Sequence, residues 1–347
     1  MIKGTPKKGK APKKTFKPQP APKAAIAISY RLEGKHLGKA AFYDHYTLAS
    51  HTGFPTTIIH ADNPSISTNQ LKSYISTQTV NIPHTPIDAT LARPVPLKLN
   101  AYTDGGLLFV PGMTRESYEK APAIHRARIR FEKSVIKDAL RRGRPILAVC
   151  AGSWTLWETL GGSIEEVTDH NYGGGMPRIS ETGKMTYNKH VHDVEISENT
   201  LLHAMLDLDD TEDENILPVN SIHWMAPSAQ KIPENFEISA TAKQNEDVSI
   251  QTRQQTEMSP EEDTVEAFTS KFGAPTAGIL WHLEAFDWGS KREADVANNK
   301  ALLFMAQAGS AYQAKQKMLA DYKNKVQAIE EDPLEGLNNV FGKLKIS

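Results

Sequence analysis

The chain has 347 residues, of which 39% are hydrophobic, and a formal net charge of −1. A chain of this size can bury a large core without a second domain. No segment approaches the ~20 apolar residues that span a bilayer, and a single cysteine excludes an internal disulfide framework. We therefore expect a protein of the reducing cytoplasm with no membrane partner.

The first 23 residues differ in composition from the rest of the chain. They carry eight lysines, five prolines and no acidic residue, whereas the remainder has 32 basic and 41 acidic residues. Such a segment has too little apolar content to offset its ordering entropy, so residues 1–23 are predicted to be a disordered basic tail. A solubilising extension is the favoured interpretation, and we expect no nucleic-acid partner apart from contact with this tail.

Short, largely apolar or β-branched runs alternate with helical patterns up to residue 163. The predicted strands are 24–30, 55–60, 105–113 and 145–150, and the predicted helices are 39–53, about 127–142 and 153–162. Alternation of this kind is typical of a parallel sheet covered on both faces. The sequence thus predicts an α/β fold with a mostly parallel central sheet flanked by helices.

The pattern changes after residue 163. Residues 190–196 alternate and predict an antiparallel edge strand, and residues 199–206 predict a short helix. The expected later elements are strands at 217–225 and 236–242, a hairpin-like pair at 264–270 and 276–286, and a helix from 292 to about 329. Polar stretches at 61–100 and 243–263 are interpreted as an excursion and a surface insertion. We expect one α/β domain over residues 24–312 and a helical extension and tail over 313–347.

Cys150 is the only cysteine and stands where a predicted strand turns into a helix. Gly152 follows, and small neighbours allow a strained turn at the carboxyl edge of the sheet. The unpaired N–H groups of the helix N-terminus favour a thiolate and can stabilise an oxyanion. A buried structural thiol is the alternative interpretation, and this stretch alone leaves both open.

A cysteine nucleophile needs a base, and the base needs an acceptor that orients it. His282 and Glu284 lie at i and i+2, so in an extended segment their side chains leave the same face. A second histidine, His223, follows another apolar strand. Taken singly, His282 also fits a core histidine and Glu284 a solvated acid.

Four stretches in order, "LLFVPGM", "GRPILAVCAGSWTLWETLGG", "VNSIHWMAP" and "AGILWHLE", together resemble the class I glutamine amidotransferase-like family. Within it they are most similar to the gamma-glutamyl hydrolase branch of cysteine peptidases. The resemblance covers about residues 24–312. It implies a flavodoxin-like α/β fold with a strand-to-helix nucleophile elbow.

The resemblance also implies roles for individual residues. Cys150 corresponds to the nucleophile, His282 to the base and Glu284 to its partner. The amides of Gly112 and Ala151 correspond to the oxyanion hole. The resemblance places Ser221 and His223 on the substrate side, in a Val-Asn-Ser-x-His motif that includes Val219 and Asn220. From their positions alone, Trp154 on the elbow helix and Trp224 beside His223 are also expected to bind substrate, with packing in the core as the alternative.

Three positions depart from the family pattern. Trp154 replaces the glutamine that helps to hold the glutamyl part of the substrate, which puts ordinary glutamine recognition in question. Leu283 stands where proline is usual, and Met113 replaces a second glycine near the oxyanion turn.

No cofactor is expected, because the implied chemistry needs neither a metal nor an organic group. His190 and His192 share one strand face, but no third ligand has diagnostic spacing, so no metal is predicted. The basic stretch 125–130 is interpreted as a solvated helix face, and the glycine-rich stretch 171–177 as a loop near the site.

The sequence thus predicts a cysteine-dependent hydrolase of gamma-glutamyl amide bonds that acts through a gamma-glutamyl thioester. The substrate would be a small molecule or a peptide, and the amine on the glutamyl group is left open. One alternative is a glutaminase subunit that delivers ammonia to a separate synthetase. Another is a non-catalytic binding module on the same fold. A homo-oligomer is left open.

Overall fold

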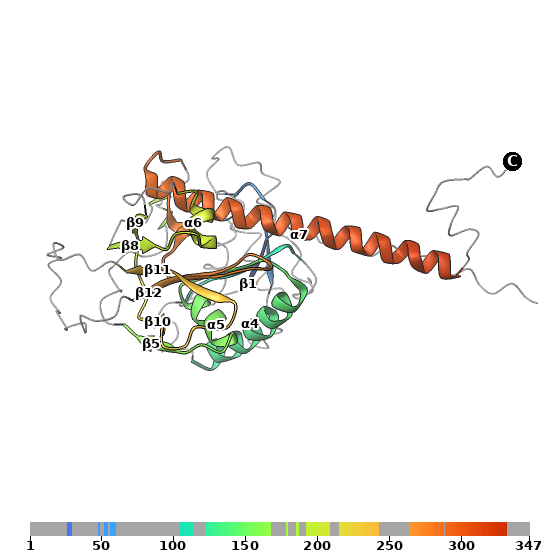
Figure 1. Ribbon diagram of the computed structural model, residues 1–347, viewed down its shortest axis with the longest axis horizontal. Helices are drawn as coiled ribbons and strands as arrows, with labels where there is room; N and C mark the ends of the chain where they lie inside the picture. The colour runs from blue at the N-terminus through green and yellow to red at the C-terminus, as the bar shows by residue number, and fades with distance from the viewer. Residues whose placement is uncertain are drawn as a thin grey trace, which may run out of the picture. The chain divides into compact units, whose positions relative to one another are not determined.

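The computed structural model describes residues 26–29, 48, 52–54, 56–59, 105–113, 122–167, 178–179, 185–186, 192–208, 215–242, 264–287 and 289–331 (Figure 1). Several sequence predictions lie outside these residues. They are the tail 1–23, most of the helix 39–53, the stretches 61–100, 171–177 and 243–263, His190, and the last residues from 332.

Among the described residues, nine strands form one sheet in the order β2-β1-β3-β4-β13-β12-β11-β8-β9. The first five are parallel: β2 (Thr56–Ile59), β1 (Ile26–Ser29), β3 (Leu107–Val110), β4 (Ile146–Val149) and β13 (Thr276–Ile279). The others join antiparallel: β12 (Val265–Ser270), β11 (Phe236–Ala242), β8 (His192–Ile196) and β9 (Ile216–Val219). The fold class, a mostly parallel central sheet flanked by helices, is confirmed.

Alternate residues of the central strands bury two different faces. Ile26, Phe109 and Val149 pack with α6 (Leu201–Leu206) and the first part of α7 (Glu293–Glu331). Ala27 and Leu108 pack with α4 (Pro122–Arg142) and α5 (Ala151–Thr159). Figure 1 shows these two pairs of helices on opposite faces of the sheet. Both faces are buried, which explains why the central parallel strands β3 and β4 are apolar throughout.

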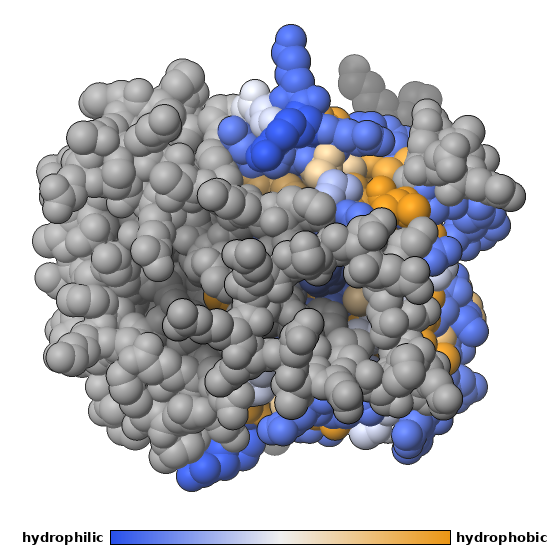
Figure 2. All heavy atoms as spheres, turned by 90° about the vertical axis from the view of Figure 1, so that its left-hand side faces the viewer, coloured by the Kyte–Doolittle hydropathy of each residue, from blue (hydrophilic) through white to orange (hydrophobic). Residues whose placement is uncertain are grey.

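The contacts divide the chain into two units. One is Pro22–Gln313, which holds the sheet and every residue of the candidate site. The described part of the other is the helical stretch 314–331 of α7. No helix among the described residues combines the length and apolarity needed to cross a membrane. Figure 2 shows one face of the molecule. Among the described residues on this face, hydrophilic side chains cover more area than hydrophobic ones, which form smaller patches between them.

The predicted hairpin is confirmed as β12 and β13, which pair antiparallel. The prediction of an edge strand at 190–196 is wrong, because β8 pairs with β11 on one side and β9 on the other. Alternation reports which face of a strand is buried, but it carries no information about neighbours in the sheet. A two-stranded sheet of β5 (Ile164–Glu166) and β10 (Met225–Pro227) was not predicted, nor was the pair β6 (Arg178–Ile179) and β7 (Met185–Thr186).

Candidate active site

Cys150 occupies the turn between β4 and α5 with φ 52° and ψ −121°, the conformation of a strained elbow. Neighbouring elements hold it there. Its amide donates to the carbonyl of Ile279 in β13 (2.8 Å), and its carbonyl accepts from the amide and hydroxyl of Ser153 (2.9 and 2.6 Å). The predicted strand-to-helix elbow is therefore present, with the thiol buried at its tip.

Gly152 is required by the close approach of α5 to β3. A Cβ at this position would lie 2.0 Å from the carbonyl oxygen of Val110. Any side chain would push the start of the helix, and with it Cys150, away from the end of β3. The spacing Cys-x-Gly is therefore explained by packing at the elbow.

His282 and Glu284 contact each other directly, with 2.8 Å between Nδ1 and Oε1. The expected geometry was an extended segment, but Leu283–Ala285 forms a 3-10 helix, η2, that begins after His282. The tight turn brings the two side chains together where an extended chain would only align them. Both are buried, so the ion pair is shielded from water.

The charge state of His282 follows from its neighbours. Burial alone would lower its pKa, but the Glu284 carboxylate and the hydrogen bond and charge of Cys150 raise it from 6.5 to about 10. Because Glu284 engages Nδ1, Nε2 is the nitrogen left for the sulfur. An imidazolium at this place favours the thiolate, the form of sulfur that attacks a carbonyl carbon.

Gly112, in the turn after β3, borders both the nucleophile and the base. A Cβ built on it would lie 3.2 Å from Sγ of Cys150 and 3.4 Å from Cε1 of His282. The segment after β3 thus meets Cys150 and His282, and Ala151 begins α5, where first-turn amides have no partner within the helix. These positions are compatible with an oxyanion hole formed by the amides of Gly112 and Ala151.

A buried network on α4 holds the Gly112 turn. Arg128 donates to the carbonyls of Pro111 (2.6 Å) and Gly112 (3.1 Å) and pairs with Glu132 (2.7 Å), which also accepts from Ser29 (2.7 Å). The prediction of a solvated face over 125–130 is therefore wrong for Arg128 and His125, which are buried, although Arg126 and Arg130 are exposed.

The sequence contains a signal for this buried network. Arg128 and Glu132 lie on the same helical stripe as the buried Val135, Ile136 and Ala139. An arginine and a glutamate four residues apart on the apolar stripe of a helix indicate a buried pair, not a solvated one.

Asn220 was expected on the substrate side but braces His282. Its side-chain amide donates to the carbonyl of His282 (2.9 Å) and its oxygen accepts from the His282 amide (2.8 Å). Two residues later, the carbonyl of Ile222 lies 3.9 Å from Sγ of Cys150. The segment after β9 therefore contacts both the base and the nucleophile.

The four predicted substrate-binding residues separate into two pairs. Ser221 and His223 are fully buried, and His223 contacts Glu266. Trp154 and the half-buried Trp224 pack edge to face, with ring centroids 4.8 Å apart. Trp154 lies in the first turn of α5, the helix that begins after Cys150.

Residues 105–259 match the family model described as Peptidase C26. This match confirms the resemblance to the class I glutamine amidotransferase-like family, and it indicates a hydrolase-type enzyme. It includes Gly112, Cys150 and the Asn220 segment and ends before His282 and Glu284, which the fold brings to the cysteine. No curated protein sequence matches the chain.

The fold is similar to solved structures at low identity. PurLQS from Thermotoga maritima is 13% identical with a TM-score of 0.44, covering 82% of this chain and 99% of that one. The glutaminase domain of Trypanosoma brucei CTPS with bound acivicin is 14% identical with a TM-score of 0.42, covering 82% and 93%. A glutamine amidotransferase from Methylobacillus flagellatus is 13% identical with a TM-score of 0.39, covering 84% and 93%.

Proposed function

We propose that the protein is a cysteine-dependent hydrolase of gamma-glutamyl amide bonds. The observation that carries the proposal is the buried line from Glu284 through His282 to Cys150, at a strained elbow and beside Gly112. Nucleophile, base and orienting acid are the three parts that thiol acyl transfer requires.

In the proposed reaction, the Cys150 sulfur attacks the gamma-carbonyl carbon, and the oxyanion accepts hydrogen bonds from the amides of Gly112 and Ala151. His282 gives its proton to the departing amine, which leaves a gamma-glutamyl thioester on the sulfur. His282 then takes a proton from water as the water attacks the thioester, and the thiolate leaves with free glutamate-type acid as product. Glu284 holds the imidazole in one orientation throughout.

The aromatic pair supports an amine with a carbon chain over ammonia. Trp224 is half-buried and offers apolar ring surface, and the buried Trp154 packs edge to face against it. Ring faces and edges gain by covering methylene groups, whereas the ammonia released from glutamine offers none. We therefore propose gamma-glutamyl derivatives of larger amines as preferred substrates and glutamine as a poor one.

The test is hydrolysis of a panel of gamma-glutamyl amides and glutamine by the wild type and by Cys150→Ala. We expect Cys150→Ala to lose at least about 10⁴-fold in kcat on the best substrate, as removal of a nucleophile does in comparable enzymes. Its thermal unfolding should stay close to that of the wild type. Intact mass spectrometry of quenched wild type should show a glutamyl adduct that the variant lacks.

Two results would change the assignment. Turnover of the best substrate by Cys150→Ala at the wild-type rate would remove the cysteine mechanism. Hydrolysis of glutamine in preference to every other amide would favour the glutaminase alternative.

A further inference from the structure

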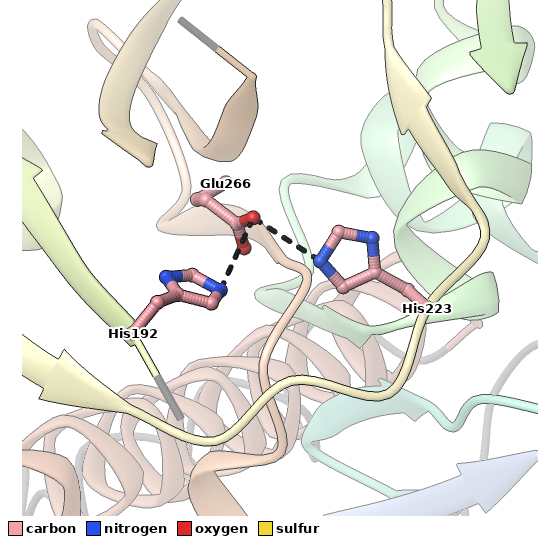
Figure 3. Close-up of side chains that lie close together, drawn as sticks. All are labelled: His192, His223 and Glu266. Carbon is pink, nitrogen blue, oxygen red and sulfur yellow. Dashed lines mark hydrogen bonds and ion pairs between the residues drawn. The ribbon is translucent and has the colours of Figure 1, made fainter. Parts of the chain in front are cut away.

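Three side chains from three remote elements converge beside the active-site segment (Figure 3). His192 comes from β8, His223 from the link between β9 and β10, and Glu266 from β12. Nε2 of His223 lies 3.1 Å from Oε1 of Glu266, and Nε2 of His192 lies 3.7 Å from the same oxygen. All the candidate ligand atoms lie within 4.8 Å of one another.

Backbone carbonyls determine which ring nitrogens face the carboxylate. Nδ1 of His223 lies 3.1 Å from the carbonyl oxygen of Met225, and Nδ1 of His192 lies 3.1 Å from that of Asp193. A carbonyl oxygen can only accept, so each Nδ1 carries the proton. Nε2 of each ring is therefore the nitrogen that faces the Glu266 carboxylate, and Figure 3 marks these two contacts with dashed lines.

We propose that this cluster binds a divalent transition-metal ion of the zinc class. Two imidazoles and one carboxylate are a ligand set that such ions favour, and histidines that bind metals usually donate their other N–H to a carbonyl or carboxylate. The sequence showed no third ligand of diagnostic spacing for His190 and His192. In the structure, His192 instead lies beside His223 and Glu266, and Glu266 is more than 70 residues away along the chain.

The three ligand atoms must move slightly closer together to coordinate an ion. Tetrahedral zinc with bonds of about 2.0–2.1 Å holds its ligand atoms roughly 3.3 Å apart. His192 is the ligand that can move, since its side chain is 14% exposed whereas those of His223 and Glu266 are fully buried. A shift of its ring on the order of 1 Å would close the site, and water would take the fourth position.

An ion here would join two segments that support the candidate active site. The carbonyl of Glu266 accepts from the amide of Leu280, two residues before His282. His223 adjoins Ile222, whose carbonyl lies beside the Cys150 sulfur. The metal ion is thus structural: it links β8, β12 and the segment after β9, and it takes no part in the proposed acyl transfer.

The test uses the full-length chain, freed of metal by chelation and dialysed, and then titrated with Zn²⁺ or with Co²⁺ as a spectroscopic probe. We expect one ion per chain, a tetrahedral Co²⁺ visible spectrum, and a rise in unfolding temperature on the order of 5 °C at 100 times the Kd. His192→Ala should weaken binding by more than the roughly 10–100-fold that loss of an outer partner costs. Its metal-free unfolding temperature should remain near that of the wild type.

Two matched variants keep the proposal open to disproof. Cys150→Ala removes the other thiol–imidazole pair that could hold zinc, and it should bind as the wild type does. Glu266→Gln keeps the volume but loses the charge, and it should bind poorly. Wild-type protein that binds no metal, or binding that survives His192→Ala and disappears in Cys150→Ala, would overturn the proposal.

Discussion

His282 is held by three kinds of partner. Glu284 accepts from the ring, Asn220 brackets the backbone on both sides, and Cys150 lies at the remaining ring nitrogen. The two hydrogen bonds of Asn220 fix the backbone of His282, and the Glu284 contact fixes the orientation of its ring. A base oriented at both its backbone and its ring needs little reorganisation when it transfers a proton.

The raised pKa of His282 predicts a pH dependence of stability. Burial lowers this pKa, but Glu284 and Cys150 bring it to about 10. The protonated form therefore contributes stability that is fully present below about pH 6.5, and this contribution is lost as the pH rises toward 10. Glu284→Gln should lower the free energy of unfolding most near pH 6.5 and progressively less toward pH 10.

Urea unfolding of the wild type and Glu284→Gln at several pH values measures this difference. Glutamine keeps an acceptor for Nδ1, so the comparison isolates the charge. A gap between the two proteins that widens as the pH rises would contradict the raised pKa.

At the scale of elements, the turn after β3 depends on α4. Arg128 binds two successive carbonyls of that turn and one carboxylate, using the geometry of its planar guanidinium. Helix α4 is thereby tied to the residue that borders both Cys150 and His282. The elbow after β4 and the turn after β3 are thus positioned by different helices.

We expect Arg128→Lys to reduce kcat about 10- to 100-fold on the best substrate with little change in KM. Lysine keeps the charge opposite Glu132 but cannot span the same three acceptors, so the turn shifts against the sulfur. Arg130→Lys on the same helix is the matched control, since Arg130 is exposed. Equal kinetics for Arg128→Lys and Arg130→Lys would show that the network does not position the site.

At the scale of the whole molecule, the first part of α7 packs against the sheet and supports the segment that carries the base. The indole N–H of Trp281 donates to Asn298 (2.8 Å), and Asn298 in turn donates to the carbonyl of Ala294. Trp281 and Asn298 are fully buried. A helix near the end of the chain thereby anchors the residue next to His282.

Asn298→Ala should destabilise the protein by about 1–3 kcal/mol, because the buried indole N–H loses its acceptor. Gln307→Ala removes an amide from an exposed position of the same helix and should change stability by less than about 0.5 kcal/mol. Chemical denaturation of both variants gives the comparison. Equal destabilisation by the two substitutions would mean that the contact with Trp281 contributes nothing.

Local patterns sufficed for much of this protein. Apolar runs within 24–30, 105–113 and 145–150 predicted β1, β3 and β4, and the strand–Cys-x-Gly–helix pattern predicted the elbow. Burial on both faces and turn geometry act within a few residues, so these features can be predicted locally. The proximity of His282 and Glu284 could also be predicted from the sequence. Side chains at i and i+2 can meet in more than one backbone conformation, so the 3-10 turn did not change the outcome.

The sequence by itself determined the fold class, the elbow at Cys150 and the residue types available for acyl transfer. Only the tertiary structure decided that β8 is internal to the sheet, that Arg128 and Asn220 position the turn and the base, and that Glu266 joins His192 and His223. The reason is physical: strand pairing and side-chain convergence depend on contacts between segments far apart along the chain, and periodicity within one segment carries no record of them.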